Sequence, residues 1–86
     1  MKKKIVFCSH AEDKFALLKE HRFPVSRKNV IETLNFPEKT ERGYKNRWVN
    51  QKAIDKTHVL RVVYEKREDD IFVITFYPGR RSFYES

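Results

Sequence analysis

The spacing of apolar residues changes once along this chain, and that change limits what the chain can fold into. After a short apolar run, the apolar side chains of residues 11–34 recur every three or four positions, which is helical spacing. From Arg47 onward the apolar segments are short and rich in β-branched and aromatic residues, as strands are. Because elements of two kinds pack as layers, we predict an α+β fold in which two N-terminal helices pack on a sheet.

Four strands are predicted, and the sheet that they form is mostly antiparallel. Residues 5–8 are apolar throughout, which favours a position inside the sheet. Residues 48–54, 58–66 and 71–77 form the other strands, and Pro78-Gly79 is expected to break the last of them. The predicted order of elements is therefore β-α-α-β-β-β.

Capping signals predict where the helices begin and end. Ser9 followed by Glu12 matches a capping box, so the first helix is expected to begin there and to end before Pro24. Ser26 is a second N-cap residue and opens a shorter helix. The polar stretch of residues 38–46 is predicted to be the longest loop and the most mobile segment.

The size and composition of the chain indicate one small cytoplasmic domain. Its 86 residues are enough for one core and too few for two, so a single domain is expected to span residues 1–86. The longest apolar run, residues 5–8, is far shorter than the roughly 18 residues that cross a membrane. The single cysteine, Cys8, forms no internal disulfide, which suits a reducing compartment.

The charge of the chain restricts its partners. It carries 19 Lys and Arg against 12 Asp and Glu, a net charge of +7. Such a balance favours nucleic-acid phosphates, acidic proteins or anionic membranes. The membrane is the weakest of the three hypotheses, because neither short helix combines a basic face with a bulky aromatic one.

The residues that could bind a metal are too scattered to form a site. His10 and His21 are eleven residues apart, which places them about 16 Å apart along an ideal helix. The sequence contains no H-x-x-x-H or C-x-x-C motif. Ser9 is better explained as a helix cap, and Cys8 as a core residue, than as nucleophiles. We therefore predict neither a metal nor another cofactor.

A basic and aromatic cluster in the C-terminal half is the strongest sign of function. Arg61 interrupts an apolar strand, and Arg80, Arg81 and Tyr84 follow the end of the neighbouring strand. Hairpin geometry can bring these residues together, and guanidinium groups beside a stacking tyrosine suit an RNA site. The alternative, of equal weight, is a solvated basic tail with Arg61 paired to a carboxylate such as Glu65.

The order of elements and several short segments resemble the RelE/ParE superfamily of toxin proteins. Residues 60–65, 72–75 and 79–84 look like its strands and its C-terminal segment, while residues 21–26 and 35–38 are similar to the helix region of BrnT-type and other RelE-like members. The resemblance covers most of the chain. It implies a RelE-like fold and a toxin of a type II toxin–antitoxin pair, which in RelE-like members cuts mRNA, often within the ribosome, without a metal.

The resemblance also implies roles for single residues. Arg61 and Arg81 would stabilise a phosphate as catalytic residues, and Tyr84 would orient a base or move a proton. In this reaction the ribose 2′-hydroxyl attacks the adjacent phosphate, which leaves a cyclic phosphate and a 5′-hydroxyl.

The chain departs from RelE in the basic residues around this site. RelE carries two lysines on the strand before the mid-strand arginine, whereas the matching strand here offers only Lys52, with Arg47 further back. The general base is therefore open, and His10 and His58 are the side chains best suited to proton transfer near neutral pH. The residues expected to bind RNA are Lys52, Arg47, Arg80, His58 and His10.

A second hypothesis is a non-catalytic module of the same superfamily, which engages a protein target or holds RNA without cutting it. Under both hypotheses the expected partner is an acidic antitoxin protein that masks the basic surface.

Overall fold

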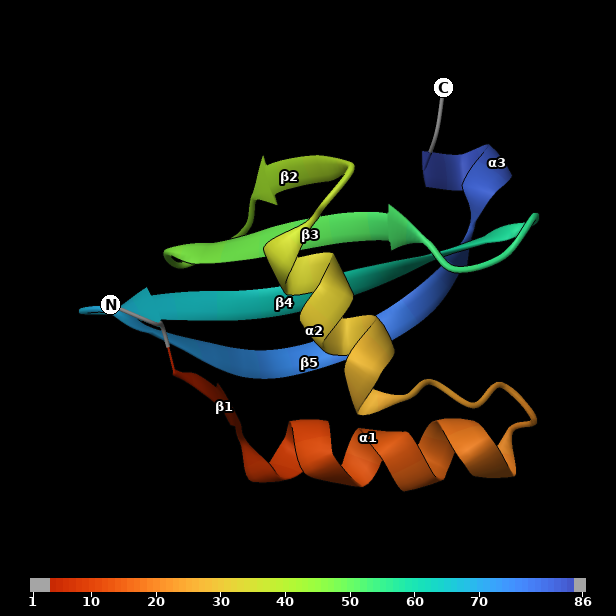
Figure 1. Cartoon of the computed structure of the whole chain (residues 1–86), viewed down its shortest axis with the longest axis horizontal. Coiled ribbons are helices and arrows are strands. Elements are labelled where there is room, and N and C mark those ends of the chain that lie inside the picture. The colour runs from red at the N-terminus through yellow and green to blue at the C-terminus, as the bar shows by residue number, and fades with distance from the viewer. Residues whose placement is uncertain (1–3, 85–86) are drawn as a thin grey trace.

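The fold is built on a five-stranded sheet, and α1 and α2 share one core with it. Helix α2 crosses in front of the sheet, and α1 runs beside its β5 edge (Figure 1). The computed structural model describes residues 4–84. The predicted α+β class and the two N-terminal helices are confirmed. In chain order the elements are β1 (Ile5–Phe7), α1 (Ser9–Glu20), α2 (Arg27–Asn35), β2 (Lys39–Arg42), β3 (Arg47–Ala53), β4 (His58–Arg67), β5 (Asp70–Arg80) and α3 (Arg81–Tyr84).

The strands lie in the order β1-β5-β4-β3-β2. Only the pairing of β1 with β5 is parallel, and the other three pairings are antiparallel, so the sheet is mostly antiparallel as predicted. The prediction that the first strand lies inside the sheet is wrong, because β1 forms an edge. Its apolar character has another cause, since Ile5 and Phe7 pack against the core beneath the helices.

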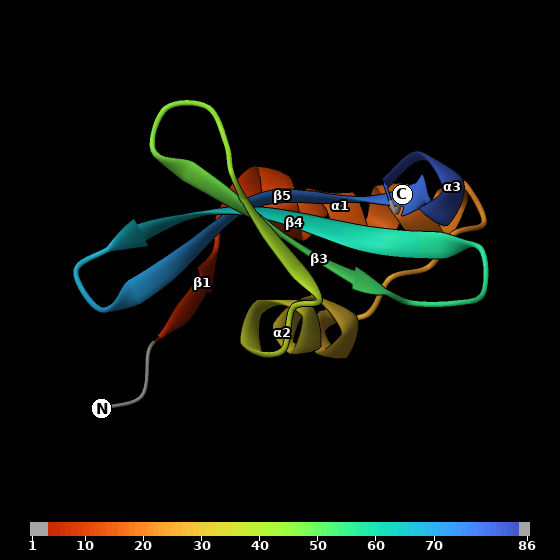
Figure 2. The same cartoon turned by 90° about the horizontal axis from the view of Figure 1, so that it is seen from above.

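The fifth strand, β2, lies within the polar stretch that was predicted to be a loop. It pairs with β3, and its residues are polar because it is an exposed edge strand. The remaining turn is short and projects from the end of the sheet (Figure 2). Lys45 and Asn46 take positive φ angles of 55° and 62°, which a tight hairpin turn requires.

Strand β5 continues through Pro78-Gly79, where the sequence predicted a break. Pro78 pairs with Leu60 and Gly79 with Val59, so the antiparallel ladder to β4 is kept. The other neighbour of β5 is β1, and it pairs only with residues 71–73. Proline is tolerated here because the missing N–H belongs to an open edge rather than to a ladder hydrogen bond.

The two long helices begin in different ways. The predicted capping box at Ser9 is wrong, because Ser9 is already helical and the N-cap is Cys8, which makes no side-chain cap. The Sγ of Cys8 instead donates to the carbonyl of Ile74 at 3.1 Å. The prediction of Ser26 as the N-cap of α2 is confirmed, and its hydroxyl accepts the backbone N–H of Asn29 at 3.1 Å.

The end of α1 uses a left-handed residue without glycine. Arg22 has a φ of 61°, and its backbone N–H donates to the carbonyl of Lys19. The N–H of Phe23 reaches back to the carbonyl of Leu18 at 2.8 Å. This pair of bonds is a Schellman motif, and it turns the chain toward α2.

The core lies between the helices and one face of the sheet. Leu60, Val62 and Tyr64 point from β4 toward the helices, so alternation sends Arg61 and Val63 to the other face. We call that other face, which lies opposite the core, the open face. Within residues 4–84 no helix is both long and apolar enough to cross a membrane. The buried core residues are Ala11, Leu18, Val25, Val30, Leu34, Leu60, Val62, Tyr64, Ile71, Val73 and Phe76.

Candidate functional site

Three polar side chains form a row across the open face. The strand register pairs Gln51 of β3 with Arg61 of β4, and Arg61 with Tyr77 of β5. Directly opposed residues of antiparallel strands share a face and lie about 5 Å apart. The register alone therefore places the side chains of Gln51 and Tyr77, which are both neutral, on either side of the Arg61 guanidinium.

Arg61 is buried, and protein groups hold its guanidinium in place. Its side chain is 8% exposed, its Nε donates to the hydroxyl of Tyr77 at 3.0 Å, and its Nη1 donates to the Gln51 carbonyl. Nη1 also lies 3.4 Å from Oε1 of Glu41, which comes from the edge strand β2. The charge of a buried guanidinium needs such partners, so these contacts position Arg61 as well as stabilise it.

The ring of Tyr84 lies over the same guanidinium. Its centroid is 4.4 Å from Cζ of Arg61, which is a cation–π contact. Gly79 makes this approach possible, because a Cβ there would lie 2.3 Å from a Tyr84 ring carbon. Gln51 also donates from Nε2 to the Tyr84 carbonyl at 3.4 Å. Helix α3 is thus folded onto the open face and brings Tyr84 to Arg61, which is one of the two arrangements that the sequence left open.

One edge of the buried guanidinium remains open. Every side-chain N or O atom that is sealed from solvent in the described part of the chain has a hydrogen-bond partner. Nη2 of Arg61 makes no hydrogen bond to residues 4–84, so it must reach solvent. An oxyanion arriving over the open face can accept a hydrogen bond from it.

The charges of this cluster are set by its neighbours. A hydrogen bond from Lys39, together with Arg61, holds the pKa of the Glu41 carboxyl below its usual value. Burial acts to lower the pKa of Arg61, but the hydrogen bonds to Tyr77 and Glu41 outweigh it and the pKa is raised. At neutral pH the site therefore holds a guanidinium cation beside an ionised carboxylate.

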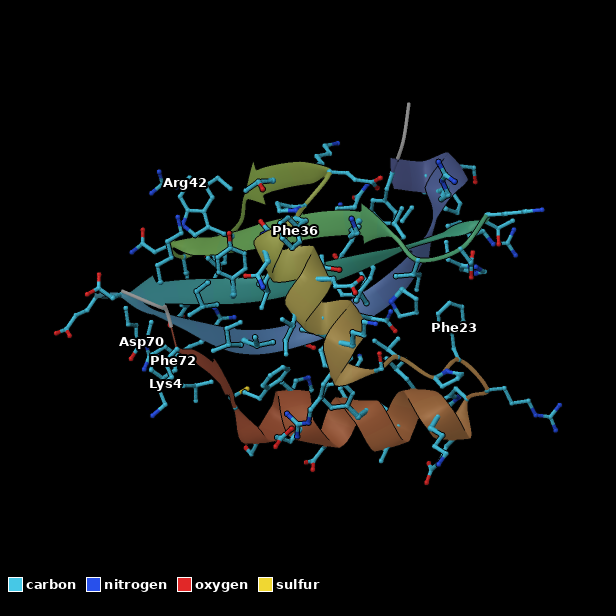
Figure 3. The ribbon with its side chains drawn as sticks, in the orientation of Figure 1. Lys4, Phe23, Phe36, Arg42, Asp70 and Phe72 are labelled. Atoms are coloured by element: carbon cyan, nitrogen blue, oxygen red, sulfur yellow. The ribbon has the colours of Figure 1, made fainter. Side chains whose placement is uncertain are left out.

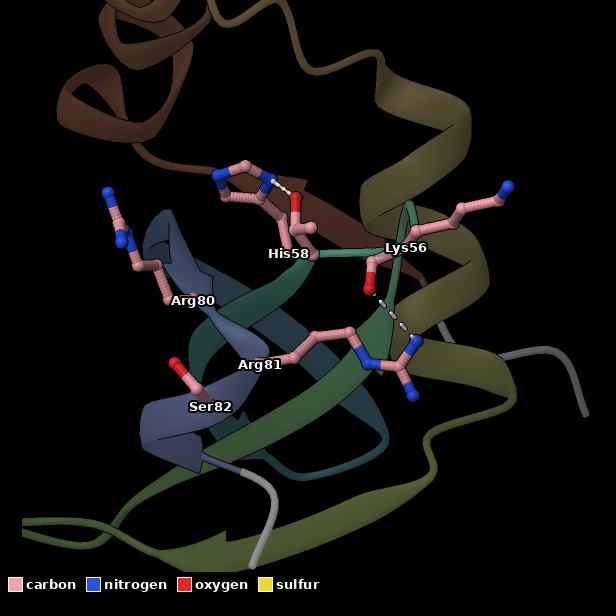
Figure 4. A pocket seen from close by; sticks show the side chains of 6 residues that line it. Lys56, His58, Arg80, Arg81 and Ser82 are labelled. Carbon is pink, nitrogen blue, oxygen red and sulfur yellow. Dashed lines mark hydrogen bonds between the residues drawn. The ribbon is translucent and has the colours of Figure 1, made fainter.

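A second basic cluster lies at the end of the sheet, around a shallow cavity of about 470 Å³. His58 and Arg80 are cross-strand partners there, and Arg81 begins α3 beside them. Phe23 lies in the connection between α1 and α2 (Figure 3). Its ring packs edge-on against that of His58, with 4.7 Å between the ring centroids. The cavity is lined by Lys56, Thr57, His58, Arg80, Arg81 and Ser82 (Figure 4).

The other residues expected to bind RNA lie apart from Arg61. Lys52 points to the helix side, where its Nζ donates to the Phe36 carbonyl at 3.3 Å. Arg47 is on the open face but pairs with Glu65, four positions along β4 from Arg61 and so about 13 Å away. His10 is exposed at the start of α1.

The Arg61 cluster consists of Arg61, Gln51, Tyr77, Glu41 and Tyr84. Three of these residues were not selected from the sequence. Gln51 and Tyr77 carry no motif, and only the strand register could have selected them. Glu41 lies in the stretch that was predicted to be a loop. Within residues 4–84 no group of three or more His, Cys, Asp and Glu side chains could hold a metal ion.

Comparisons with protein-family models, with curated proteins and with solved structures found no match to this chain.

Proposed function

We propose that this chain is a toxin of a type II toxin–antitoxin pair and acts as a metal-independent mRNA endoribonuclease. The observation that supports this best is the Arg61 cluster. A buried guanidinium is fixed by Tyr77 and Gln51, lies under the ring of Tyr84, and keeps one N–H edge toward solvent. Preorganised donors of this kind stabilise the negative charge that develops on a phosphate in the transition state.

The reaction requires no cofactor. The 2′-oxygen of the ribose forms a bond to the adjacent phosphorus while the bond from phosphorus to the 5′-oxygen breaks. A base takes the proton of the 2′-hydroxyl, and an acid gives a proton to the departing 5′-oxygen. The products are a 2′,3′-cyclic phosphate and a 5′-hydroxyl. Arg61 would stabilise the phosphate, and Tyr84 would stack on a neighbouring base or supply the proton.

Glu41 is the residue that the geometry favours as the general base. Its carboxylate is ionised at neutral pH, 41% exposed, and 3.4 Å from Nη1 of Arg61. A proton acceptor must lie within hydrogen-bond reach of the group that it deprotonates, and Glu41 borders the place where Arg61 would hold the phosphate. His10, on α1, and His58, on the helix side of β4, do not share the open face with Arg61.

A second candidate function is RNA binding without cleavage. Two nitrogens of Arg61 are already engaged by protein groups, and a guanidinium held in this way also stabilises the fold. Under this hypothesis the positive surface supplies phosphate contacts, and the Arg61 cluster is structural. A ParE-like module that engages a protein target would use the same fold.

The proposed partner is an acidic antitoxin protein. The net charge of +7 would attract an acidic segment and speed its association, and the segment would mask the surface that binds RNA.

The test is RNA cleavage by the purified full-length chain in the presence of EDTA, with the RNA ends mapped, together with growth after induced expression. We expect cyclic-phosphate and 5′-hydroxyl ends and growth arrest. Glu41→Gln should lower the cleavage rate by about 10²-fold or more, the range for a lost general base. Tyr84→Phe should lower it as much where the hydroxyl supplies the proton, and should leave it near the wild-type rate where the ring only stacks on a base.

The matched control is Lys45→Gln, which removes one charge from the β2–β3 turn, and it should cleave normally. Thermal unfolding of each variant separates lost chemistry from lost structure. Binding of RNA without new ends, in a folded wild-type protein, would favour the non-catalytic module. Growth arrest without RNA cleavage would point to a protein target.

A further inference from the structure

The cavity at the end of the sheet combines positive charge with hydrogen-bond donors. Arg80 extends from β5 on the side of His58, while Arg81 extends toward Lys56 and donates from Nη1 to the Lys56 carbonyl at 3.4 Å (Figure 4). The hydroxyls of Thr57 and Ser82 also line it. Among residues 4–84 no carboxylate lines this cavity, although the carboxylate of Asp55 contacts Nδ1 of His58.

The surroundings of His58 orient its ring. Nδ1 lies 2.9 Å from the Thr57 hydroxyl and 3.1 Å from a carboxylate oxygen of Asp55, and Phe23 packs against the ring. Nδ1 faces both carboxylate oxygens of Asp55, so it carries the proton and donates to them, and the Thr57 hydroxyl also donates to Asp55. In the imidazolium form the ring carries a second N–H, at Nε2. Neither Nε2 of His58 nor the guanidinium of Arg80 has a hydrogen-bond partner among residues 4–84, which leaves both groups for a ligand.

We propose that this cavity is a phosphate-binding site, held by His58 and Arg80 and supported by Lys56. The guanidinium of Arg80 and the imidazolium form of His58 place N–H groups on one rim that match the oxygens of a phosphate, and a cross-strand pair on a sheet fixes their spacing. A phosphodiester of an RNA strand and a free phosphate monoester share this chemistry. The net charge of the chain and the neighbouring Arg61 cluster favour the RNA strand, a choice that rests on the proposed function.

The cavity holds a phosphate other than the one at Arg61. His58 and Arg61 are three positions apart on β4, which corresponds to about 10 Å, and their side chains leave opposite faces of the strand. One phosphate cannot contact both. A strand that reaches both sites must pass around the end of the sheet beside α3, so the cavity would fix the register of the RNA relative to Arg61.

The first experiment is a titration of the full chain with inorganic phosphate, followed by amide chemical shifts at constant ionic strength. We expect saturable shifts at Thr57, His58, Arg80 and Ser82, and about fivefold weaker binding in Arg80→Gln, near the upper limit for one exposed charged contact. Absence of saturable shifts at these amides would overturn the proposal.

Two variants control this titration. Lys45→Gln removes the same charge at the opposite end of β3, and it should leave the phosphate affinity unchanged. Arg61→Gln should also leave it unchanged while it abolishes any RNA cleavage. A loss of the cavity shifts in Arg61→Gln, with the other amide signals still those of the folded protein, would show that the two sites are not separate. Because the titration does not depend on cleavage, a failure here is distinct from a failure of the proposed ribonuclease.

The second experiment identifies the source of the phosphate. It uses single-stranded 2′-O-methyl RNA, which lacks the attacking hydroxyl, and measures affinity against salt concentration. Removing one phosphate contact should make the slope of log affinity against log salt shallower by about 0.7 in Arg80→Gln. An unchanged slope in a protein that still binds inorganic phosphate would overturn RNA as the source and leave a free phosphate as the ligand.

Discussion

At the scale of single residues, the cross-strand partner of Arg61 on β5 could not be worked out from its position in the sequence. Counting back from the β4–β5 turn, where Arg67 pairs with Asp70, places Arg61 opposite Phe76. A bulge near Ile74 shifts the register by one residue, so Tyr77 is the partner instead. A buried aromatic would have left the Nε of Arg61 without a hydrogen bond, whereas the tyrosine hydroxyl provides one.

A prediction at this scale concerns the glycine beneath Tyr84. In Gly79→Ala the new methyl group would overlap the Tyr84 ring, so the ring must leave Arg61 and the protein should lose about 1–3 kcal/mol of stability. Urea unfolding measures the loss, and RNA cleavage should fall with it. Gly43→Ala is the comparison, because its Cβ would meet the Arg47 carbonyl at 3.1 Å, away from Tyr84. Equal cleavage in both variants would argue against a role for the stacked ring.

A second residue-scale prediction concerns Tyr64. It is buried in the core, where burial raises its pKa, and its hydroxyl donates to Asn50 at 3.0 Å. Tyr64→Phe should lose about 1 kcal/mol at neutral pH, the usual net value of one hydrogen bond. Since the folded-state pKa lies above the unfolded one, the stabilisation is complete below about pH 10 and is lost as the pH rises through the folded-state value.

The measurement is urea unfolding of wild type and Tyr64→Phe between pH 7 and pH 11. The gap between them should narrow above about pH 10. A gap that stays constant would mean that Tyr64 is solvated in the native state.

At the scale of elements, Ser9 and Ser26, which lie at the starts of α1 and α2, allow the effect of a helix cap on stability to be compared. Ser26 and Asn29 bond each other reciprocally at the start of α2, whereas Ser9 lies inside the first turn of α1 and caps nothing. Ser26→Ala should therefore cost about 0.5–2 kcal/mol, and Ser9→Ala less than about 0.5 kcal/mol. The free energy of unfolding in urea checks both. A larger loss from Ser9→Ala than from Ser26→Ala would contradict the assignment of the two helix starts.

The edge strand β2 forms without any strand pattern in its sequence. Nothing in its four polar residues predicts a strand, yet the backbone pairs with β3, and the Thr40 hydroxyl donates to Asn50 at 2.9 Å. An edge strand has solvent on one side, so it needs no apolar pattern. This strand is what brings Glu41 beside Arg61.

At the scale of the whole molecule, stability depends on one core between the helices and the sheet. Phe76 is fully buried at its centre, with its ring 4.7 Å from that of Phe15. Phe76→Ala should cost about 3–5 kcal/mol, a large part of the stability of a small domain. Phe83→Ala removes the same ring from a site that is 80% exposed and should change stability by less than about 0.5 kcal/mol.

The free energy of unfolding of the two variants, measured in urea, tests whether this core is the only one. Similar losses for Phe76→Ala and Phe83→Ala would mean that α3 is part of a second buried cluster rather than a cover over the open face.

The sequence by itself determined the fold class, the two helices and the three long strands, because these depend on local periodicity and on capping that neighbouring residues supply. It also singled out Arg61 and Tyr84, since an arginine inside an apolar strand and an aromatic residue after a strand end are visible in one dimension. Only the tertiary structure decided the edge position of β1, the pairing of β2, and the groups that surround Arg61. Those features depend on strand order and register, which are set by contacts between residues far apart in the chain, and a single bulge is enough to change them.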